Sequence, residues 1–389
     1  MLRDDPAAMV TPAKTDVVII GGGPAGLVAA LAARRQGFGV CLVDRGIPPI
    51  DKACGEGLMP DGVAALRGLG VRLDADQGVP FRGIRFLDDR HVAEATFPEE
   101  AGVGIRRTRL HQLLMENAQA TGVTTLWREK ATAIESKGVR IGDHLIECRW
   151  IIGADGVDSQ TRRLAGMGAI RENGRRIGLR MHFRVKPWTD FVEVHWSKGE
   201  QAYVTPVGAE EVCIALLGCA REVGFANLAD RFPRLGERLR GAESANVARG
   251  AFTGTVRLHR VVSGNVALIG DASAAIDAIT GDGLALAFRQ AAALGEALRQ
   301  GDLSRYEARH RQICRTPFLM ARLLLLMDRH DTFRKLGLQA LAGRRAIFNR
   351  LLATHVGARH PAAASLDVVA LGVGLLAHAA TSRSRSAAP

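Results

Sequence analysis

Three glycines at a regular spacing are the first residues in the chain that could bind a nucleotide. Gly21, Gly23 and Gly26 form a G-x-G-x-x-G pattern that encloses Pro24 and Ala25. Glycines at this spacing permit a tight turn and a close backbone approach, and the N-terminus of a following helix offers free N–H groups to a pyrophosphate. We therefore expect these five residues to cradle the pyrophosphate of a dinucleotide.

The segments around the glycines have the pattern of the βαβ unit that this role requires. Residues 16–20 (DVVII) are a β-branched run typical of a buried parallel strand, and residues 27–36 form an alanine-rich helical run. A second strand, residues 40–43, ends at Asp44, whose carboxylate can accept hydrogen bonds from a ribose, with Arg45 beside it. The unit predicts a Rossmann-like dinucleotide site, but it does not distinguish FAD from NAD.

A second motif indicates which dinucleotide is bound. Asp155 and Gly156 follow a strand-like segment and begin a D-G-x-x-S-x-x-R pattern that runs through Ser159 to Arg162. Gly156 lets the backbone approach a ligand closely, and the Arg162 guanidinium can anchor the loop or a phosphate. The pattern resembles a fingerprint of the p-hydroxybenzoate hydroxylase-like flavoprotein superfamily, which includes aromatic hydroxylases, geranylgeranyl reductases and flavin halogenases. The resemblance implies that the dinucleotide is FAD.

A third group of residues comprises Gly270, Asp271, Gly281, Asp282 and Gly283, between a predicted strand and a long helical run. The resemblance implies that Asp271 bonds to the ribityl chain of FAD. It also implies that the turn at 281–283 and the helix N-terminus lie against the flavin pyrimidine ring, where they stabilise negative charge. This superfamily usually has a proline where the chain has Ala278, and alanine does not fix the backbone φ as proline does.

An arginine at a predicted helix start adds a fourth match. Arg107 and Leu110, in the helical segment 106–120, fit the R-x-x-L element of the superfamily. The resemblance implies that Arg107 reaches the ribityl or phosphate groups of FAD; the alternative is a solvated arginine at a helix start. The four matches together cover roughly residues 16–290.

The candidate catalytic residues come from a loop and from a β-rich segment. Cys54 and Gly55 lie in the loop where this superfamily places residues beside the isoalloxazine ring, and the Cys-Gly pair is similar to geranylgeranyl reductases; a small buried hydrophobe is the alternative reading of Cys54. Tyr203 falls on a strand that, by resemblance, lines the substrate face of the flavin. His195 on a neighbouring strand and His182 are further candidate acid/base groups, although a lone histidine on a sheet is more often structural.

Composition and charge narrow the class of protein. The 389 residues are 47% hydrophobic and 24% charged, with a net charge of +12, and they contain no nucleic-acid-binding signature. The six cysteines form no C-x-x-C pair and no metal-ligand spacing, which favours reduced thiols in the cytoplasm and no metal site. Residues 1–14 contain no secretory signal, and the apolar run at 368–380 is too short to span a membrane.

Alternating β/α segments, a β-rich insertion and a return to α/β predict an α/β fold: a parallel-sheet, Rossmann-like FAD-binding domain, an inserted β-sheet substrate domain and a helical C-terminal region. We expect the FAD-binding domain in three parts (14–78, 104–179 and 257–300), the substrate domain in two (79–103 and 180–256) and the helical region at 301–389. Within the insertion, residues 226–239 read as one helical segment. Basic amphipathic segments after residue 320 suit peripheral contact with the inner membrane face; helices that cap the flavin domain or mediate dimers fit equally well. The sequence leaves the oligomeric state open.

Two reactions fit these residues. The first, which we favour, is hydroxylation of a lipophilic aromatic or phenolic molecule by O2 through a flavin C4a-hydroperoxide. The alternative is a geranylgeranyl reductase-like reduction of C=C bonds in a lipophilic or isoprenoid substrate, which the Cys-Gly loop and the apolar C-terminus favour. Either reaction needs a reductant, and we expect NAD(P)H to dock transiently. A halogenase is disfavoured because the W-x-W-x-I-P motif is absent, and a flavin-binding scaffold without a substrate is the remaining alternative.

Overall fold

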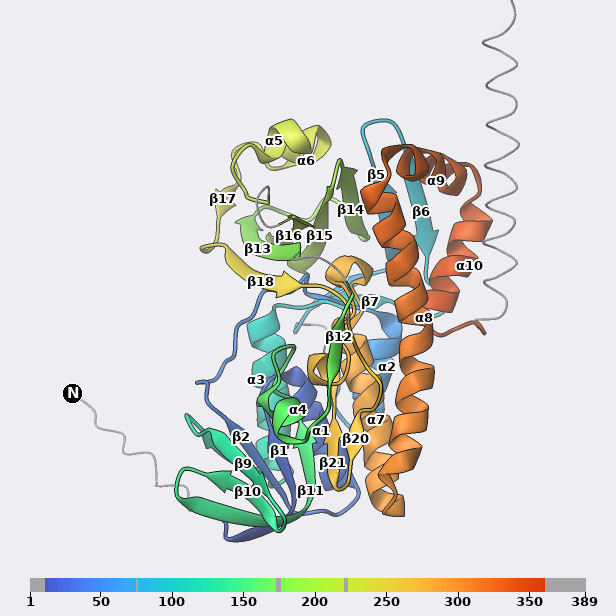
Figure 1. Cartoon of the computed structure of the whole chain (residues 1–389). Coiled ribbons are helices and arrows are strands. Elements are labelled where there is room, and N and C mark those ends of the chain that lie inside the picture. Colours follow the sequence, from blue (N-terminus) through green and yellow to red (C-terminus); the bar gives the residue numbers. More distant parts are fainter. Residues whose placement is uncertain (1–10, 75, 173–175, 220–222, 361–389) are drawn as a thin grey trace, which may run out of the picture.

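The first sheet of the protein is mostly parallel and carries the glycine motifs at one edge. The computed structural model describes residues 11–74, 76–172, 176–219 and 223–360. The sheet has the strand order β20-β21-β11-β1-β2-β8, with β9 and β10 added through β11, and it occupies the lower part of Figure 1. Its strands are β1 (Lys14–Ile20), β2 (Val40–Asp44), β8 (Thr124–Trp127), β9 (Ala131–Glu135), β10 (Gly138–Ile141), β11 (His144–Gly153), β20 (Val262–Ser263) and β21 (Val266–Leu268).

Burial on both faces explains why this sheet forms from apolar runs. The last four residues of β1 and the first four of β2 are buried, as expected of parallel strands covered on both sides. Helix α1 (Pro24–Arg35) begins with proline at its first turn, where the missing N–H costs nothing, and packs against α3 (Arg107–Ala120) and α7 (Gly283–Gln300). The sheet and these helices hold the core of the nucleotide-binding half.

A second, largely antiparallel sheet occupies the upper part of Figure 1. Its order is β17-β13-β16-β15-β14-β5-β6, with β18 also paired to β13. Its strands are β5 (Gly83–Leu87), β6 (Val92–Thr96), β13 (Arg176–Arg184), β14 (Val192–Ser197), β15 (Glu200–Gly208), β16 (Glu211–Cys219), β17 (Glu243–Ser244) and β18 (Arg249–Thr253). Both parts of the predicted insertion therefore join in one sheet.

The last described part of the chain, from residue 303 to residue 355, is helical and connects the two sheets. Helix α8 (Leu303–Arg329) packs on α7 and on the short helix η2 (Ala278–Thr280), and in Figure 1 it runs alongside both halves of the protein. Helices α9 (Asp331–Gly343) and α10 (Arg345–His355) follow it and pack on β6. The apolar faces of these helices therefore cover one side of the second sheet.

Short elements complete the described chain. They are β3 (Gly57–Leu58), β4 (Val79–Phe81), β7 (Gly102–Gly104), β12 (Ala169–Arg171), β19 (Val256–Leu258), α2 (Pro60–Gly68), α4 (Gln160–Leu164), α5 (Leu228–Arg231), α6 (Pro233–Arg238) and η1 (Gly270–Ala272). The expected fold class is confirmed: a parallel-sheet domain, further sheets and C-terminal helices. The segment expected as one helix at 226–239 is instead two helices, because Pro233 lacks an N–H and begins a new helix. The domain boundaries stay a prediction.

Two buried side chains of α8 attach this helix to the first sheet. The Tyr306 hydroxyl donates to the Leu268 carbonyl (2.7 Å), and both groups are fully buried. One turn further on, His310 Nε2 lies 2.9 Å from Ser273 Oγ, which itself donates to the Gly270 carbonyl. Because Ser273 uses its proton on Gly270, the histidine is the donor in this pair. Burial, with Arg311 as a smaller contributor, lowers the pKa of His310 to about 4.

This buried histidine predicts a loss of stability in acid. In the unfolded chain His310 binds a proton near pH 6.5, whereas in the folded chain it does so only near pH 4. The contribution of neutral His310 to the free energy of unfolding is therefore complete above pH 6.5 and is lost as the pH falls from 6.5 toward 4. Between pH 7.5 and pH 5 we expect a loss of about 2 kcal/mol in the free energy of unfolding. Urea titrations across this range should show a shallower pH slope for His310→Gln, which keeps a donor for Ser273. An equal slope in both proteins would contradict the assignment.

Candidate functional site

One cavity of about 960 Å³ joins the edge of the parallel sheet to the second sheet and the C-terminal helices. The predicted site residues that line it are Gly21, Gly23, Pro24, Ala25, Asp44, Arg45, Cys54, Gly55, Arg107, Asp155, Gly156, Tyr203, Gly270, Asp271, Gly281 and Gly283. Gly26, Arg162, Asp282 and His195 are not among the lining residues. The segments that carry the motifs therefore meet at one place although they are far apart in sequence.

The three glycines of the first motif play different structural parts. Gly21 has a positive φ of 116°, and a Cβ on Gly26 would lie 1.8 Å from the Gly21 carbonyl oxygen, so both positions are restricted by the turn itself. A Cβ on Gly23 would meet no protein atom within 4 Å. Gly23 therefore faces open space in the cavity, which is where a ligand can approach the backbone.

Asp44 is held by the backbone around it. Its Oδ2 accepts from the Gly22 N–H (2.5 Å) and its Oδ1 from the Gly46 N–H (2.6 Å). Each carboxylate oxygen can still accept a second hydrogen bond. The side chain is thus fixed in place with acceptor capacity left for a ribose hydroxyl.

The residues present fit FAD. Arg107 Nε is buried and has no hydrogen-bond partner among the described atoms, although the side chain lines the cavity. A buried guanidinium nitrogen without a partner is costly, and a phosphate or ribityl oxygen would satisfy it. The open face of Gly23 and the uncapped N-terminus of α1 provide the matching cradle for a pyrophosphate.

The Asp-Gly motif organises its own loop. Asp155 accepts hydrogen bonds from the Ser159 hydroxyl and from both the N–H and the hydroxyl of Thr161 (2.9 and 3.0 Å). Arg162 is buried and donates to the carbonyls of Val157 (2.8 Å) and Ala272 (3.1 Å). Of the two roles that the sequence left open for Arg162, its contacts match the anchoring of the loop to η1.

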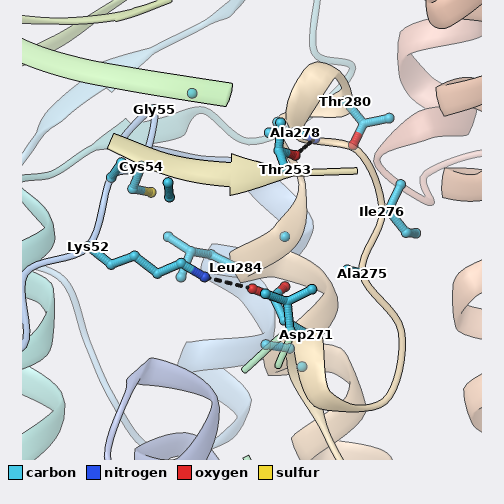
Figure 2. A pocket seen from close by; sticks show the side chains of 18 of the residues that line it. Lys52, Cys54, Gly55, Thr253, Asp271, Ala275, Ile276, Ala278, Thr280 and Leu284 are labelled. Carbon is cyan, nitrogen blue, oxygen red and sulfur yellow. Dashed lines mark hydrogen bonds and ion pairs between the residues drawn. The ribbon is translucent and has the colours of Figure 1, made fainter. Parts of the chain in front are cut away.

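The third motif contributes an ion pair at the cavity wall. Lys52 Nζ lies 3.0 Å from Asp271 Oδ2, and Figure 2 shows the lysine side chain extended toward this carboxylate. Both side chains are 42% exposed, so solvent screens the pair and its contribution to stability is small. Asp271 can therefore exchange Lys52 for a ribityl hydroxyl at little cost.

Buried polar contacts hold the loop that lacks the usual proline. Asp277 accepts from the Ile279 N–H at the start of η2 and pairs with Arg176 at 2.6 Å. Arg176 also donates to Gln201 (2.8 Å), and the Tyr203 hydroxyl donates to the Ile279 carbonyl (2.6 Å). Burial raises the pKa of Asp277, and Arg176 opposes that shift. These contacts fix the segment around Ala278, where a proline would otherwise restrict the backbone.

The candidate catalytic residues differ in position. Cys54 lines the cavity, and Figure 2 shows it on the same loop as Lys52. Tyr203 also lines the cavity, but its hydroxyl is bonded to Ile279 and burial raises its pKa. His195 points to the opposite face of β14, where its Nε2 lies 3.1 Å from Glu193 Oε2. Burial acts to raise the pKa of Glu193, but hydrogen bonds from His195, Arg85 and Trp188 lower this pKa to about 2. The geometry does not support a catalytic role for His195.

The sequence analysis named His182 as a candidate but missed the buried cluster that it forms with Glu56 and Cys213 near Cys54. Glu56, His182 and Cys213 place one ligand-type atom each within 4.8 Å of one another, a set that could in principle hold a metal ion. Glu56 and His182 are however hydrogen-bonded at 2.6 Å, and Arg180 Nε lies 3.9 Å from the carboxylate. The adjacent guanidinium favours hydrogen bonding over a cation. A glutamate between two glycines was the signal in the sequence that could have added Glu56 to this group.

Beyond the residues near Cys54 the cavity lining is mainly apolar, and it includes one histidine, His355 on α10. Its walls there come from strands β5 and β14 and from helices α8 to α10, and include Ile84, Phe86, Val194, Leu323, Met327, Phe348 and Leu352. Within the described residues, no helix is both long enough and apolar enough to cross a membrane. The apolar run at 368–380 lies outside the described residues. An apolar chamber therefore adjoins the predicted flavin site.

Three comparisons with known proteins place this geometry in context. A family model described as an FAD binding domain matches residues 14–210. A menaquinone reductase of Mycobacterium tuberculosis is 28% identical over 323 residues (75% of this chain, 78% of the relative), and a digeranylgeranylglycerophospholipid reductase of Methanocella arvoryzae is 23% identical over 347 residues (76% and 83%). A solved flavoprotein/dehydrogenase from Cytophaga hutchinsonii has a TM-score of 0.79 at 20% identity and covers 93% of this chain and 98% of its own.

The open face of Gly23 gives a first test of the cofactor site. Gly23→Ala should fold normally, because its Cβ meets no protein atom, but should lower FAD affinity at least about tenfold by filling the space that the pyrophosphate needs. Equilibrium binding of FAD to stripped protein measures the loss. Gly68→Ala, at another glycine with open space but outside the cavity, serves as the matched control. Unchanged affinity in Gly23→Ala would contradict the cradle.

The Arg176–Asp277 pair gives a second test. Arg176→Met should lower the free energy of unfolding by about 3 to 5 kcal/mol, because it leaves a buried carboxylate without its partner, and should also weaken FAD retention by releasing the loop. Arg82→Met breaks an ion pair whose side chains are 57% and 59% exposed, and should cost less than about 1 kcal/mol. Urea unfolding and the bound FAD fraction are the measurements. Similar small losses in both variants would count against the anchoring role.

Proposed function

This chain belongs to the FAD binding domain family and is an FAD-dependent oxidoreductase, and we propose that it reduces carbon–carbon double bonds in a long apolar, isoprenoid-like substrate. The observation that carries the proposal is the apolar chamber that continues from the loop of Cys54 to helices α8 to α10. Burial of a hydrocarbon chain there contributes about 0.8 kcal/mol per methylene. The names of the menaquinone and digeranylgeranyl lipid reductases to which the chain is similar support this substrate class.

The residues around the chamber have distinct tasks in this reaction. Bound FAD, once reduced, would supply the two electrons. Gly23, Asp44 and Arg107 would hold it, and the apolar walls would orient the substrate and exclude water. Saturation of one C=C bond takes up two electrons and two protons. One proton would arrive together with the electrons as hydride, and a side chain at the chamber must supply the other to the second carbon.

We take Cys54, on the loop beside the predicted flavin site, as the candidate for that proton donor. Tyr203 uses its hydroxyl proton on the Ile279 carbonyl, and Thr205 uses its own on the Gly55 carbonyl (2.7 Å). The thiol of Cys54 accepts from the Glu56 N–H at 3.4 Å, which leaves its S–H uncommitted among the described contacts. We assign Cys54 as the proton donor of the reductase.

The same contacts argue against the hydroxylation that the sequence analysis favoured. A phenol hydroxylase benefits from a base that removes the phenol proton, and the candidate bases were Tyr203, His195 and His182. Tyr203 is held protonated by burial, and neither His195 nor His182 is among the residues that line the cavity. Transient docking of NAD(P)H and peripheral membrane contact of the C-terminal helices stay predictions.

Product mass under anaerobic conditions tests the proposed reaction. The dithionite-reduced enzyme should convert a menaquinone with an unsaturated side chain, or geranylgeraniol, to a product two hydrogens heavier without O2. Cys54→Ala should slow this turnover by about 10² to 10⁴, the usual contribution of a positioned acid. A product one oxygen heavier, formed from an alkylphenol only in air, would instead establish the hydroxylase. Retained anaerobic activity in Cys54→Ala would remove this cysteine from the mechanism.

A further inference from the structure

We propose that Glu56 and His182 form a buried positioning pair that sets the reactivity of the Cys54 thiol. The inference rests on the proposed function only in that the Cys54 thiol is used there as a proton donor. It assigns roles to Glu56, which follows Gly55 in the loop of Cys54 and lines the cavity, and to His182, which lies on β13 of the second sheet and does not line it. The pair acts through the backbone of Glu56.

Glu56 has a backbone conformation that glutamate rarely adopts. Its φ is +59°, in the left-handed region, although Gly55 and Gly57 on either side could adopt such a conformation without strain. A side chain in this region persists when its surroundings hold it there. The strain at Glu56 therefore points to an anchor on its side chain.

The carboxylate of Glu56 supplies that anchor. It is 2% exposed, and its Oε1 accepts from the Arg107 N–H (3.0 Å) while its Oε2 lies 2.6 Å from His182 Nε2. The Glu56 carbonyl also accepts from the Ile105 N–H (2.9 Å). Side chain and backbone are thus fixed together at the N-terminus of α3.

His182 is oriented for this contact from its other side. The ring is fully buried, and its Nδ1 lies 2.6 Å from the Asn246 side-chain amide and 3.2 Å from Arg180. Asn246 Oδ1 accepts from the His182 N–H, so its amide nitrogen is the group that donates to the ring. With Nδ1 an acceptor, Nε2 carries the proton and donates to Glu56.

The charges in this cluster are balanced. Arg180 lies beside the Glu56 carboxylate and pairs with Asp51, which in turn pairs with Arg249 (2.8 Å). Opposite charge and hydrogen-bond donors compensate a buried carboxylate for its lost solvation. Glu56 therefore serves as a fixed acceptor.

The consequence reaches Cys54 through one hydrogen bond. The anchored conformation aims the Glu56 N–H at Cys54 Sγ (3.4 Å), and an N–H donor stabilises the thiolate form of sulfur. The charged and titratable groups around Cys54 are Lys52 with Asp271, Glu56, Arg106 and Arg107 at α3, Arg180 and His182 on β13, and Cys213 on β16, whose pKa burial raises. Through this bond the position of the Glu56 backbone acts directly on the Cys54 sulfur.

The pH dependence of Cys54 alkylation tests the pair without use of turnover. Iodoacetamide labelling of the full-length FAD-bound protein, followed by peptide mass spectrometry, gives the labelling rate of Cys54 at each pH. In His182→Leu and in Glu56→Gly, which keeps the left-handed backbone but removes the anchor, we expect the midpoint to rise by about one pH unit, or about tenfold slower labelling at a fixed lower pH. His182→Gln retains a donor and should restore the wild-type midpoint.

Controls separate this inference from misfolding and from the proposed function. His91→Gln, at a histidine paired with Asp88 away from the cavity, should leave the profile unchanged. Cys41, Cys213 and Cys314 are buried, so labelling of these three cysteines reports that a variant has unfolded. If His182→Leu is unfolded by this criterion, Glu56→Gly serves as the test. Coincident profiles in all folded variants would overturn the inference even in an active reductase. Shifted profiles in a protein that reduces no alkene would sustain it while the proposed function fails.

Discussion

The parallel pairing of β1, β11 and β21 is the interaction on which the rest of the site depends. Ile20 lies opposite Gly153, and Gly153 lies opposite Leu268, so the three strands end at the same edge of the sheet. Each strand is followed directly by one of the glycine motifs. Parallel strands need long crossover connections, and here those connections contain α1, α3 and the whole second sheet. The cofactor edge therefore exists only when distant segments pair in the correct register.

The second half of the molecule must then be held at a fixed position over that edge. Arg176, at the start of β13, makes buried contacts with Asp277 in the loop before η2 and with Asp328 near the end of α8 (3.4 Å). Gln201 joins the same cluster from β15. An ion pair in an apolar interior costs desolvation unless its partners are well placed, and three acceptors around one guanidinium meet that condition. The cluster ties the flavin loop, the second sheet and the C-terminal helices at one point.

The parts of the site that could be predicted from the sequence are those whose chemistry is local. The Gly21 to Gly26 turn and the Asp44 carboxylate lie within one βαβ unit, and their types and spacing are visible in the sequence. The Glu56–His182 contact joins residues on a loop and on β13 that only the tertiary fold brings together. His195 was a candidate by residue type, but strand alternation turns it away from the cavity. Which face of a strand lines the cavity depends on how the sheet packs against the rest of the protein, and the residue types alone do not determine that face.

An apolar chamber and a proton donor impose opposing demands, and the loop of Cys54 satisfies both. A dry, hydrocarbon-lined cavity excludes water, yet each saturated double bond consumes a proton. A charged side chain in the chamber would be costly to desolvate, whereas a thiol is small, weakly polar and tolerated among apolar groups. The polar groups that influence this thiol are concentrated on one side of the cavity, where Glu56 and His182 are hydrogen-bonded and Arg180 lies beside them. The charged groups of this cluster therefore lie beside the thiol, and the walls formed by β5, β14 and helices α8 to α10 are mainly apolar.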